Sequence, residues 1–167
     1  MRSQLQPRAS GRRTAGRAQR DHILDPYHEQ HKPPQPAACP QCAAVYHRGR
    51  WQWGQPPEGA YEHLCPACRR IREHLPAGTV TLHSVPSRLK DQVTGLVRNE
   101  EEAEKREHPL NRLVAMEETG KDIVITTTDI HLPRRIGEAL KRAYHGQLDM
   151  YFDDSAYFIR VEWHPPS

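Results

Sequence analysis

The second half of the chain carries apolar residues at helical spacing. From residue 87 they recur every three or four positions, at Leu89, Val93, Leu96 and Val97. This spacing predicts an amphipathic helix that continues into the charged segment 98–107. Glu101 and Lys105 stand four residues apart in the order that supports an exposed helical turn. We therefore expect the charged segment to face solvent.

Pro109 is expected to open a second helix, because proline is favoured in the first helical turn. The apolar residues on its predicted buried side are Leu110, Leu113, Val114 and Met116. This helix would end before Gly120. The run 122–128 is rich in β-branched residues and predicts a buried strand.

Residues 133–145 show the clearest helical pattern in the chain. Their apolar positions follow the i, i+3, i+4, i+7, i+8 rule, at Ile136, Ala139, Leu140, Ala143 and Tyr144. Asp129 is placed to cap this helix, Pro133 lies in its first turn and Gly146 marks its end.

Two segments of alternating polarity close the chain and predict a β-hairpin. Their apolar residues are Leu148, Met150 and Phe152, then Tyr157, Ile159, Val161 and Trp163. The region from residue 87 is thus expected to be a small α-α-β-α-β-β domain of the α+β class. A right-handed crossover would pair the strand 122–128 with the strand 147–152.

All four cysteines lie in two Cys-x-x-Cys knuckles, Cys39 with Cys42 and Cys65 with Cys68. One tight turn can aim two sulfurs at a single ion, and two such turns supply the tetrahedral four-sulfur site typical of structural zinc. The tract between the knuckles has aromatic residues but too few apolar ones for a core of its own. The sequence therefore predicts a zinc ribbon that metal binding stabilises by roughly 10–16 kcal/mol.

Other uses of the cysteines stay open at this stage. Tetrahedral thiolates also bind iron. A thioredoxin-like redox site normally uses a single Cys-x-x-Cys. Two disulfides require an oxidising compartment, and no apolar signal segment opens the chain. We expect a soluble cytoplasmic protein with no membrane partner, because no run of eighteen apolar residues occurs.

Charge is distributed unevenly along the chain, although the formal net charge is only +3. Residues 1–20 contain six arginines and no acidic residue, a composition typical of disorder. The segment 20–28 is expected to form a turn that anchors this tail on the ribbon, and the proline-rich stretch 32–36 to act as a stiff spacer. We thus divide the chain into a disordered basic tail and linker (1–36), a zinc ribbon (37–86) and an α+β domain (87–167).

Arginines cluster around the ribbon and on the predicted C-terminal helix. Fully extended backbone over 45–53 would place Trp51 and Trp53 on a packed face and the cations on the other. Arginine interleaved with aromatic residues is typical of RNA-binding surfaces. The candidate nucleic-acid contacts are Arg48, Arg50, Arg69, Arg70, Arg72, Arg134, Arg135 and Arg142. The alternative is that such charged faces are merely solvated, with the tryptophans as ribbon core.

Over residues 20–163 the chain resembles a small, poorly characterised bacterial family linked to a low-oxygen-activated gene locus. The resemblance rests on the segments 99–112, 125–132 and 134–137. The two knuckles followed by an α/β segment are also distantly similar to the amino-terminal part of the archaeal and eukaryotic adaptor that exports the large ribosomal subunit. This chain has Pro133 where the bacterial family more often has alanine. The resemblance implies binding to RNA or the ribosome.

Three classes of function follow from the sequence. The first is a zinc-binding RNA- or ribosome-associated accessory protein, such as a low-oxygen or dormancy translation factor. The second is a zinc-ribbon regulator that binds DNA or a protein partner, although no helix-turn-helix pattern is present. The third is a small hydrolase with Asp129 and His131 as an acid–base pair. We expect no enzyme and no small-molecule substrate, because the sequence has no phosphate loop, no His-Glu-x-x-His and no free nucleophilic cysteine.

Overall fold

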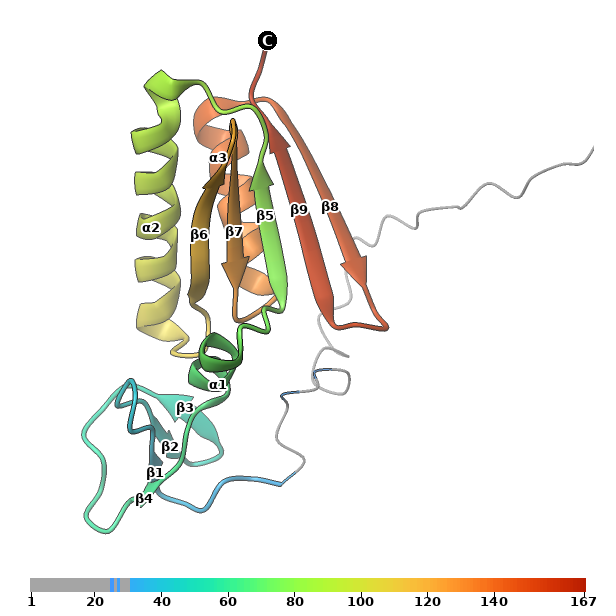
Figure 1. Cartoon of the computed structure of the whole chain (residues 1–167). Coiled ribbons are helices and arrows are strands. Elements are labelled where there is room, and N and C mark those ends of the chain that lie inside the picture. Colours follow the sequence, from blue (N-terminus) through green and yellow to red (C-terminus); the bar gives the residue numbers. More distant parts are fainter. Residues whose placement is uncertain (1–24, 26, 28–30) are drawn as a thin grey trace, which may run out of the picture.

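The computed structural model describes residues 25, 27 and 31–167, so the expected disordered tail lies outside the described residues. A small four-stranded sheet with one short helix lies at one end of the molecule, and a five-stranded sheet with two longer helices forms the rest (Figure 1). The predicted α+β class is therefore confirmed. Within the described part of the chain, no helix combines the length and apolar character needed to cross a membrane.

The five-stranded sheet has the order β6-β7-β5-β9-β8. Its elements along the chain are β5 (Gly78–Leu82), the 3-10 turn η1 (Ser87–Leu89), α2 (Lys90–Glu107), β6 (Leu113–Thr119), β7 (Asp122–Thr127), α3 (His131–Tyr144), β8 (Gln147–Asp153) and β9 (Phe158–His164). The central strand β5 runs parallel to β9, and the other neighbouring strands are antiparallel. The predicted hairpin is confirmed as β8 and β9.

One face of this sheet forms the main core. Alternate residues of β5, β7 and β9 are buried against α2 and α3, among them Leu82, Ile125 and Trp163. Val93 and Val97 of α2 and Ile136 and Leu140 of α3 complete the same cluster. The predicted helices at 87–107 and 133–145 are confirmed, because both bury most of the side that their spacing indicated, although Ala143 is exposed.

The larger sheet differs from the sequence prediction in three respects. The expected second helix after Pro109 is wrong, because residues 113–119 form the edge strand β6, joined to β7 through Gly120 in the left-handed region (φ 65°). The predicted pairing of the strand 122–128 with 147–152 is also wrong, since β5 and β9 lie between β7 and β8. Strand β5 falls in the range 37–86 assigned to the ribbon, yet it pairs with β7 and β9.

The small sheet has the order β3-β2-β1-β4 and is followed by α1. Its elements are β1 (Ala37–Ala38), β2 (Val45–His47), β3 (Arg50–Gln52), β4 (Tyr61–Glu62) and α1 (Pro66–Glu73). The expected continuous extension over 45–53 is wrong, because Arg48 and Gly49 both have positive φ (52° and 80°) and reverse the chain. This is the backbone that a two-residue hairpin of the primed type requires.

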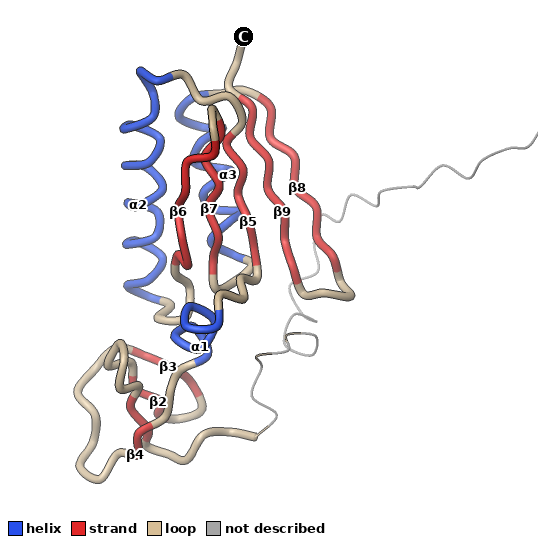
Figure 2. Tube along the Cα trace, viewed as in Figure 1, coloured by secondary structure: helices blue, strands red, loops and turns tan. Residues whose placement is uncertain are grey.

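The ribbon meets the larger sheet near α1, as the tube in Figure 2 shows. The indole Nε1 of Trp53 donates a hydrogen bond to the carbonyl oxygen of Lys105, at 2.6 Å. That carbonyl lies in the last turn of α2, where main-chain acceptors lack helical partners. Leu110, which follows α2, packs against the cysteine cluster of the ribbon. The two units are therefore joined by polar and apolar contacts.

Candidate metal centre

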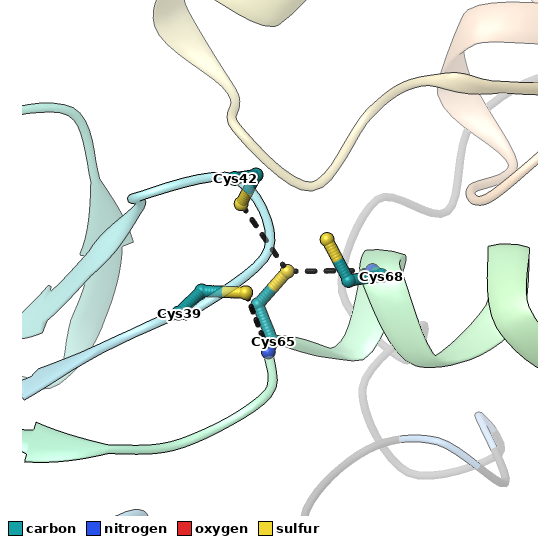
Figure 3. A group of neighbouring side chains, drawn as sticks. All are labelled: Cys39, Cys42, Cys65 and Cys68. Carbon is teal, nitrogen blue, oxygen red and sulfur yellow. Dashed lines mark hydrogen bonds between the residues drawn. The ribbon is translucent and has the colours of Figure 1, made fainter.

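The structure brings Cys39, Cys42, Cys65 and Cys68 together at the junction of the two units (Figure 3). Their sulfur atoms all lie within 4.8 Å of one another, and the Sγ atoms of Cys42 and Cys65 are 3.8 Å apart. All four are free thiols. Sulfur atoms that bind one tetrahedral zinc at about 2.3 Å stand about 3.8 Å apart. The cluster is therefore compatible with a metal ion such as zinc.

The first knuckle is a tight turn. The Ala43 N–H donates to the carbonyl of Cys39 at 2.9 Å, and the Cys39 N–H donates to the carbonyl of Ala44 at 2.8 Å. Ala43 has a positive φ of 64°, which lets the chain reverse over two residues. This reversal brings the Cys42 sulfur back toward the second knuckle.

The second knuckle lies at the start of α1. Cys65 is the N-cap residue and Pro66 opens the helix, which suits proline because the first helical N–H has no partner. The Cys65 sulfur accepts the Cys68 N–H at 3.3 Å, and the Cys39 sulfur accepts the Cys65 N–H at 3.4 Å. Main-chain donors aimed at sulfur favour the thiolate that a metal needs.

The thiols influence one another strongly. The hydrogen bond between Cys42 and Cys65 lowers the pKa of Cys42 and raises that of Cys65, because one proton is held between the two sulfurs. Burial raises the pKa of Cys68. Four crowded sulfurs thus ionise together only when a cation compensates their charge, which is the behaviour of a metal-binding set.

Arg112 supplies part of that compensation from the larger unit. Its Nη2 donates to the sulfurs of Cys65 and Cys68, at 3.3 and 3.2 Å. Burial by itself would lower the pKa of Arg112, but the bond to Cys68 and the nearby thiolate charge outweigh it and raise that pKa. The guanidinium therefore stays charged beside the sulfurs. A metal bound by four thiolates keeps a net negative charge, which this cation offsets.

The loop that carries Arg112 is fixed by Thr128 at the end of β7. The Arg112 N–H donates to Thr128 Oγ1 at 2.9 Å, and the Thr128 N–H donates to the Arg112 carbonyl at 2.9 Å. The Thr128 hydroxyl in turn donates to the Leu110 carbonyl at 2.6 Å. Arg112 was not among the site residues predicted from the sequence. It lies far from both knuckles along the chain, and only the tertiary fold brings it to the sulfurs.

The segment expected to anchor the tail is described at Asp25 and Tyr27. Asp25 Oδ1 accepts a hydrogen bond from Arg70 at 2.6 Å, and the Arg70 guanidinium lies 4.2 Å from the centre of the Tyr27 ring. The Tyr27 hydroxyl donates to Glu73 at 2.6 Å. All three contacts are made to residues of α1, so Asp25 and Tyr27 dock on the ribbon.

Two of the candidate nucleic-acid contacts are already engaged within the protein. Arg70 is only 4% exposed and is bound to Asp25 and to the carbonyl of Leu75. Arg135 joins α3 to α2 through Glu100 at 2.6 Å and Glu104 at 2.9 Å. Arg70 is therefore buried, whereas the Arg135 side chain stays 44% exposed but is paired with two carboxylates.

The remaining candidates lie at the surface in two separate groups. Near the metal centre, Arg48 and Arg50 are exposed at the tip of the β2–β3 hairpin, and Arg72 is exposed on α1. Arg69 is half-buried. A second group is formed on α3 by the exposed Arg134 and Arg142.

A cleft of about 780 Å³ opens between the ribbon hairpin and the end of the larger sheet. Its aromatic lining includes Tyr46, Trp51 and Trp53, and its cations include Arg50 and Arg106. The Trp51 ring is half-buried, with its centroid 5.4 Å from that of Tyr46, and it also packs against the cysteine cluster. Asp25, Glu107 and Asp129 also line it, so the cleft combines ring surface with side chains of both charges beside the cysteine cluster.

Asp129 lies in the wall of the same cleft, at the start of α3. Its Oδ2 accepts the N–H groups of His131 and Leu132, at 2.7 and 3.0 Å, which confirms the predicted cap. Its Oδ1 is buried and has no hydrogen-bond partner among the described residues. Burial raises the pKa of Asp129 to about 6. Asp129 was considered as one member of an acid–base pair. In the structure its carboxylate caps the N-terminus of α3.

No protein family, characterised protein or solved structure matches the chain in comparisons of sequence and fold. Its function is therefore argued from the geometry of these residues.

Proposed function

We propose that this protein is a zinc-binding, RNA-associated accessory protein whose ribbon presents an RNA-binding cleft. The observation that carries the proposal is the cleft itself, where the rings of Tyr46, Trp51 and Trp53 lie with Arg50 and Arg106 beside a four-cysteine cluster. Bases of single-stranded RNA stack on exposed aromatic side chains, here Trp53, which is 38% exposed, while arginine neutralises the phosphates.

Zinc is the metal that this cluster suits best. The donor set consists of four thiolates with tetrahedral spacing, and the knuckles are closed by main-chain hydrogen bonds. Closed four-thiolate sites are typical of structural zinc. Bound zinc would hold β2 and β3 against α1, and so keep the exposed arginines at the hairpin tip in a fixed position.

The distribution of charge supports a polyanionic partner. Arg48 and Arg50 project from the hairpin tip, and the segment 1–20 adds six arginines ahead of the ribbon. Released counterions make such binding strongly dependent on salt. Structured RNA in a ribosomal subunit fits this chemistry and agrees with the sequence resemblance. On the same resemblance, we propose that the protein acts as a low-oxygen or dormancy translation factor.

The proposal is tested by sedimentation of the tagged full chain with ribosomal subunits at low and high salt. We expect the protein to move with a subunit at low salt and to be released at high salt. The double substitution Arg48→Ala with Arg50→Ala should weaken binding, while the matched pair Arg134→Ala with Arg142→Ala on α3 should retain it. If all three proteins stay at the top of the gradient, the RNA proposal fails.

A further inference from the structure

A second group of metal-ligating side chains lies away from the cysteines, on the larger sheet. His83 follows β5, and Glu162 and His164 belong to the neighbouring strand β9. Their ligating atoms all lie within 4.8 Å of one another. Figure 1 shows that β5 and β9 end, and β7 begins, at the end of the sheet remote from the ribbon.

The strand register explains why these three side chains meet. Leu82 of β5 is paired with Trp163 of β9, and both are fully buried under the helices. Side chains alternate between the faces of a strand, so the residues next to this pair, His83 and His164, project from the opposite face. Glu162 lies two residues before His164 and shares that face. The group is half-exposed on the side that α2 and α3 do not cover.

Asp122 prepares His83 as a ligand. The Oδ2 of Asp122, at the start of β7, lies 3.4 Å from Nδ1 of His83. A carboxylate at Nδ1 favours the tautomer with its proton on that nitrogen, which leaves the lone pair of Nε2 available. This Nε2 is buried without a hydrogen-bond partner among the described residues, and the nearest oxygen of Glu162 is 3.9 Å away. A carboxylate that orients a metal-binding histidine is a common feature of metal sites.

We propose that His83, Glu162 and His164 form a second metal site, which binds a divalent transition-metal ion. Two imidazole nitrogens and one carboxylate oxygen form a donor set that suits zinc, nickel, copper and iron(II). Nitrogen and oxygen donors bind zinc at about 2.0–2.2 Å, so two donors on one ion stand about 3–4 Å apart. The distances between the three ligating atoms, all within 4.8 Å, therefore need to shorten only slightly when an ion binds.

One ring has to turn when the ion binds. The rings of His83 and His164 are stacked, with centroids 4.3 Å apart and planes 7° from parallel. An imidazole binds a metal through a lone pair in the plane of its ring, and two stacked rings cannot direct both lone pairs at one point. His83 is oriented by Asp122, so His164 is the ring that turns out of the stack.

The test uses the full chain loaded with one equivalent of zinc, which fills the cysteine site, and titrates it with Co²⁺. We expect one further ion per chain, with an absorption spectrum that lacks the thiolate-to-cobalt charge-transfer bands of a cysteine site. The substitutions His83→Asn, His164→Asn and Glu162→Gln should each weaken this binding at least about 10-fold. His74→Asn, at the C-cap of α1, is the matched control and should bind as the parent does.

Thermal melting of each variant verifies that the sheet is intact. Glutamine has nearly the same shape as glutamate, and the Glu162 side chain is partly exposed, so Glu162→Gln should keep the fold. The test therefore stays decisive even if a histidine variant unfolds. The proposal is overturned if the zinc-loaded parent binds no further Co²⁺. It is also overturned if the second ion binds Glu162→Gln as tightly as the parent, or if its spectrum shows thiolate charge transfer.

Discussion

The guanidinium of Arg112 donates hydrogen bonds from one nitrogen, Nη2, to the sulfurs of Cys65 and Cys68, at 3.3 and 3.2 Å. The cysteines belong to the ribbon, whereas Arg112 precedes β6 of the larger sheet. The cysteine cluster is therefore also a point at which the two units contact one another.

Replacing Arg112 should weaken metal binding without unfolding the larger sheet. Arg112→Ala removes the cation that offsets thiolate charge, and loss of such an outer partner typically costs about 10- to 100-fold in metal affinity. Competition with a chelator of known affinity measures the change. Arg134→Ala, which removes an exposed arginine of α3, is the matched control. Unchanged zinc affinity in Arg112→Ala would show that the contact with the sulfurs has no energetic role.

Metal removal should unfold the ribbon and spare the larger sheet, because their buried clusters are separate. Trp51 and Trp53 belong to the ribbon, while Trp163 is fully buried in the main core. A chelator should therefore increase the exposure of Trp51, which is half-buried, and of Trp53, which is already 38% exposed, and leave Trp163 buried. Hydrogen exchange should accelerate over 37–75 and stay slow in β5, β7 and β9. Simultaneous loss of protection in both units would contradict independent stability.

Trp51 and the hairpin arginines should have separable effects. Trp51 packs against the cysteine cluster, so Trp51→Ala should destabilise the ribbon by about 3 kcal/mol. Arg48→Ala with Arg50→Ala should leave the melting temperature nearly unchanged, because exposed cations contribute little to stability. Denaturation followed together with RNA binding measures both effects. If Trp51→Ala folds normally but loses RNA affinity, the ring is a base-stacking platform and the packing role is wrong.

Asp129 should make the protein less stable as pH rises from about 4 to 6. Its pKa is 3.8 when unperturbed and about 6 in the folded chain, so the folded state keeps a proton that the unfolded state has lost. The stabilisation is complete below the unfolded pKa and disappears above the folded one. Asp129→Asn keeps an oxygen for the two N–H groups and should stabilise the chain at pH 7 by up to about 3 kcal/mol.

The control for this variant is Asp154→Asn in the exposed β8–β9 turn, which should change stability by less than about 0.5 kcal/mol. Unfolding free energies of all three proteins at pH 4 and pH 7 give the comparison. The advantage of Asp129→Asn should be present at pH 7 and nearly absent at pH 4. An equal advantage at both pH values would mean that ionisation of Asp129 is not its cause.

The sequence predicted the elements whose pattern is local. Val93 and Val97 stand four residues apart, as do Ile136 and Leu140. This spacing indicates a helix in each segment, and both helices are present. The four-cysteine cluster could also be predicted from the sequence, because each Cys-x-x-Cys knuckle spans only four residues. In contrast, Leu113 and Met116 stand three apart, a spacing that suits a helix, but pairing with β7 determined their structure. In this short edge strand the alternation of apolar and polar residues is too weak to identify it as a strand from the sequence.

Long-range placement was the part that the sequence could not supply. Strand β5 is only five residues long, and its position at the centre of the sheet depends on partners more than forty residues away. The same holds for Arg112, whose contact with the cysteine sulfurs spans 44 residues or more. No spacing within a short window encodes such a contact. Arg70 was predicted to be a surface cation because it lies in a basic run. In the structure it is buried and paired with Asp25, which lies 45 residues earlier in the chain.

The two glycines inside long helices should respond in opposite ways to alanine. Gly95 in α2 has open space where a Cβ would be added, with nothing within 4 Å. Alanine is favoured over glycine in a helix, so Gly95→Ala should stabilise the protein by about 0.5–1 kcal/mol. At Gly137 in α3, an added Cβ would lie 2.8 Å from both Leu148 Cδ1 and Val161 Cγ1. There α3 lies so close to β8 and β9 that the extra carbon needs space that the core does not have.

Gly137→Ala should therefore destabilise the protein, because the strain of overpacking, about 1–3 kcal/mol, exceeds the gain in helix propensity. Urea denaturation of the zinc-loaded parent and the two single variants measures the difference with the ribbon held constant. A second-site change tests the cause. Leu148→Ala removes one of the two clashing groups, so the loss from Gly137→Ala should be smaller in that background, a coupling that a double-mutant cycle quantifies. Equal stabilisation by both glycine substitutions would mean that α3 can move away from the sheet at little cost.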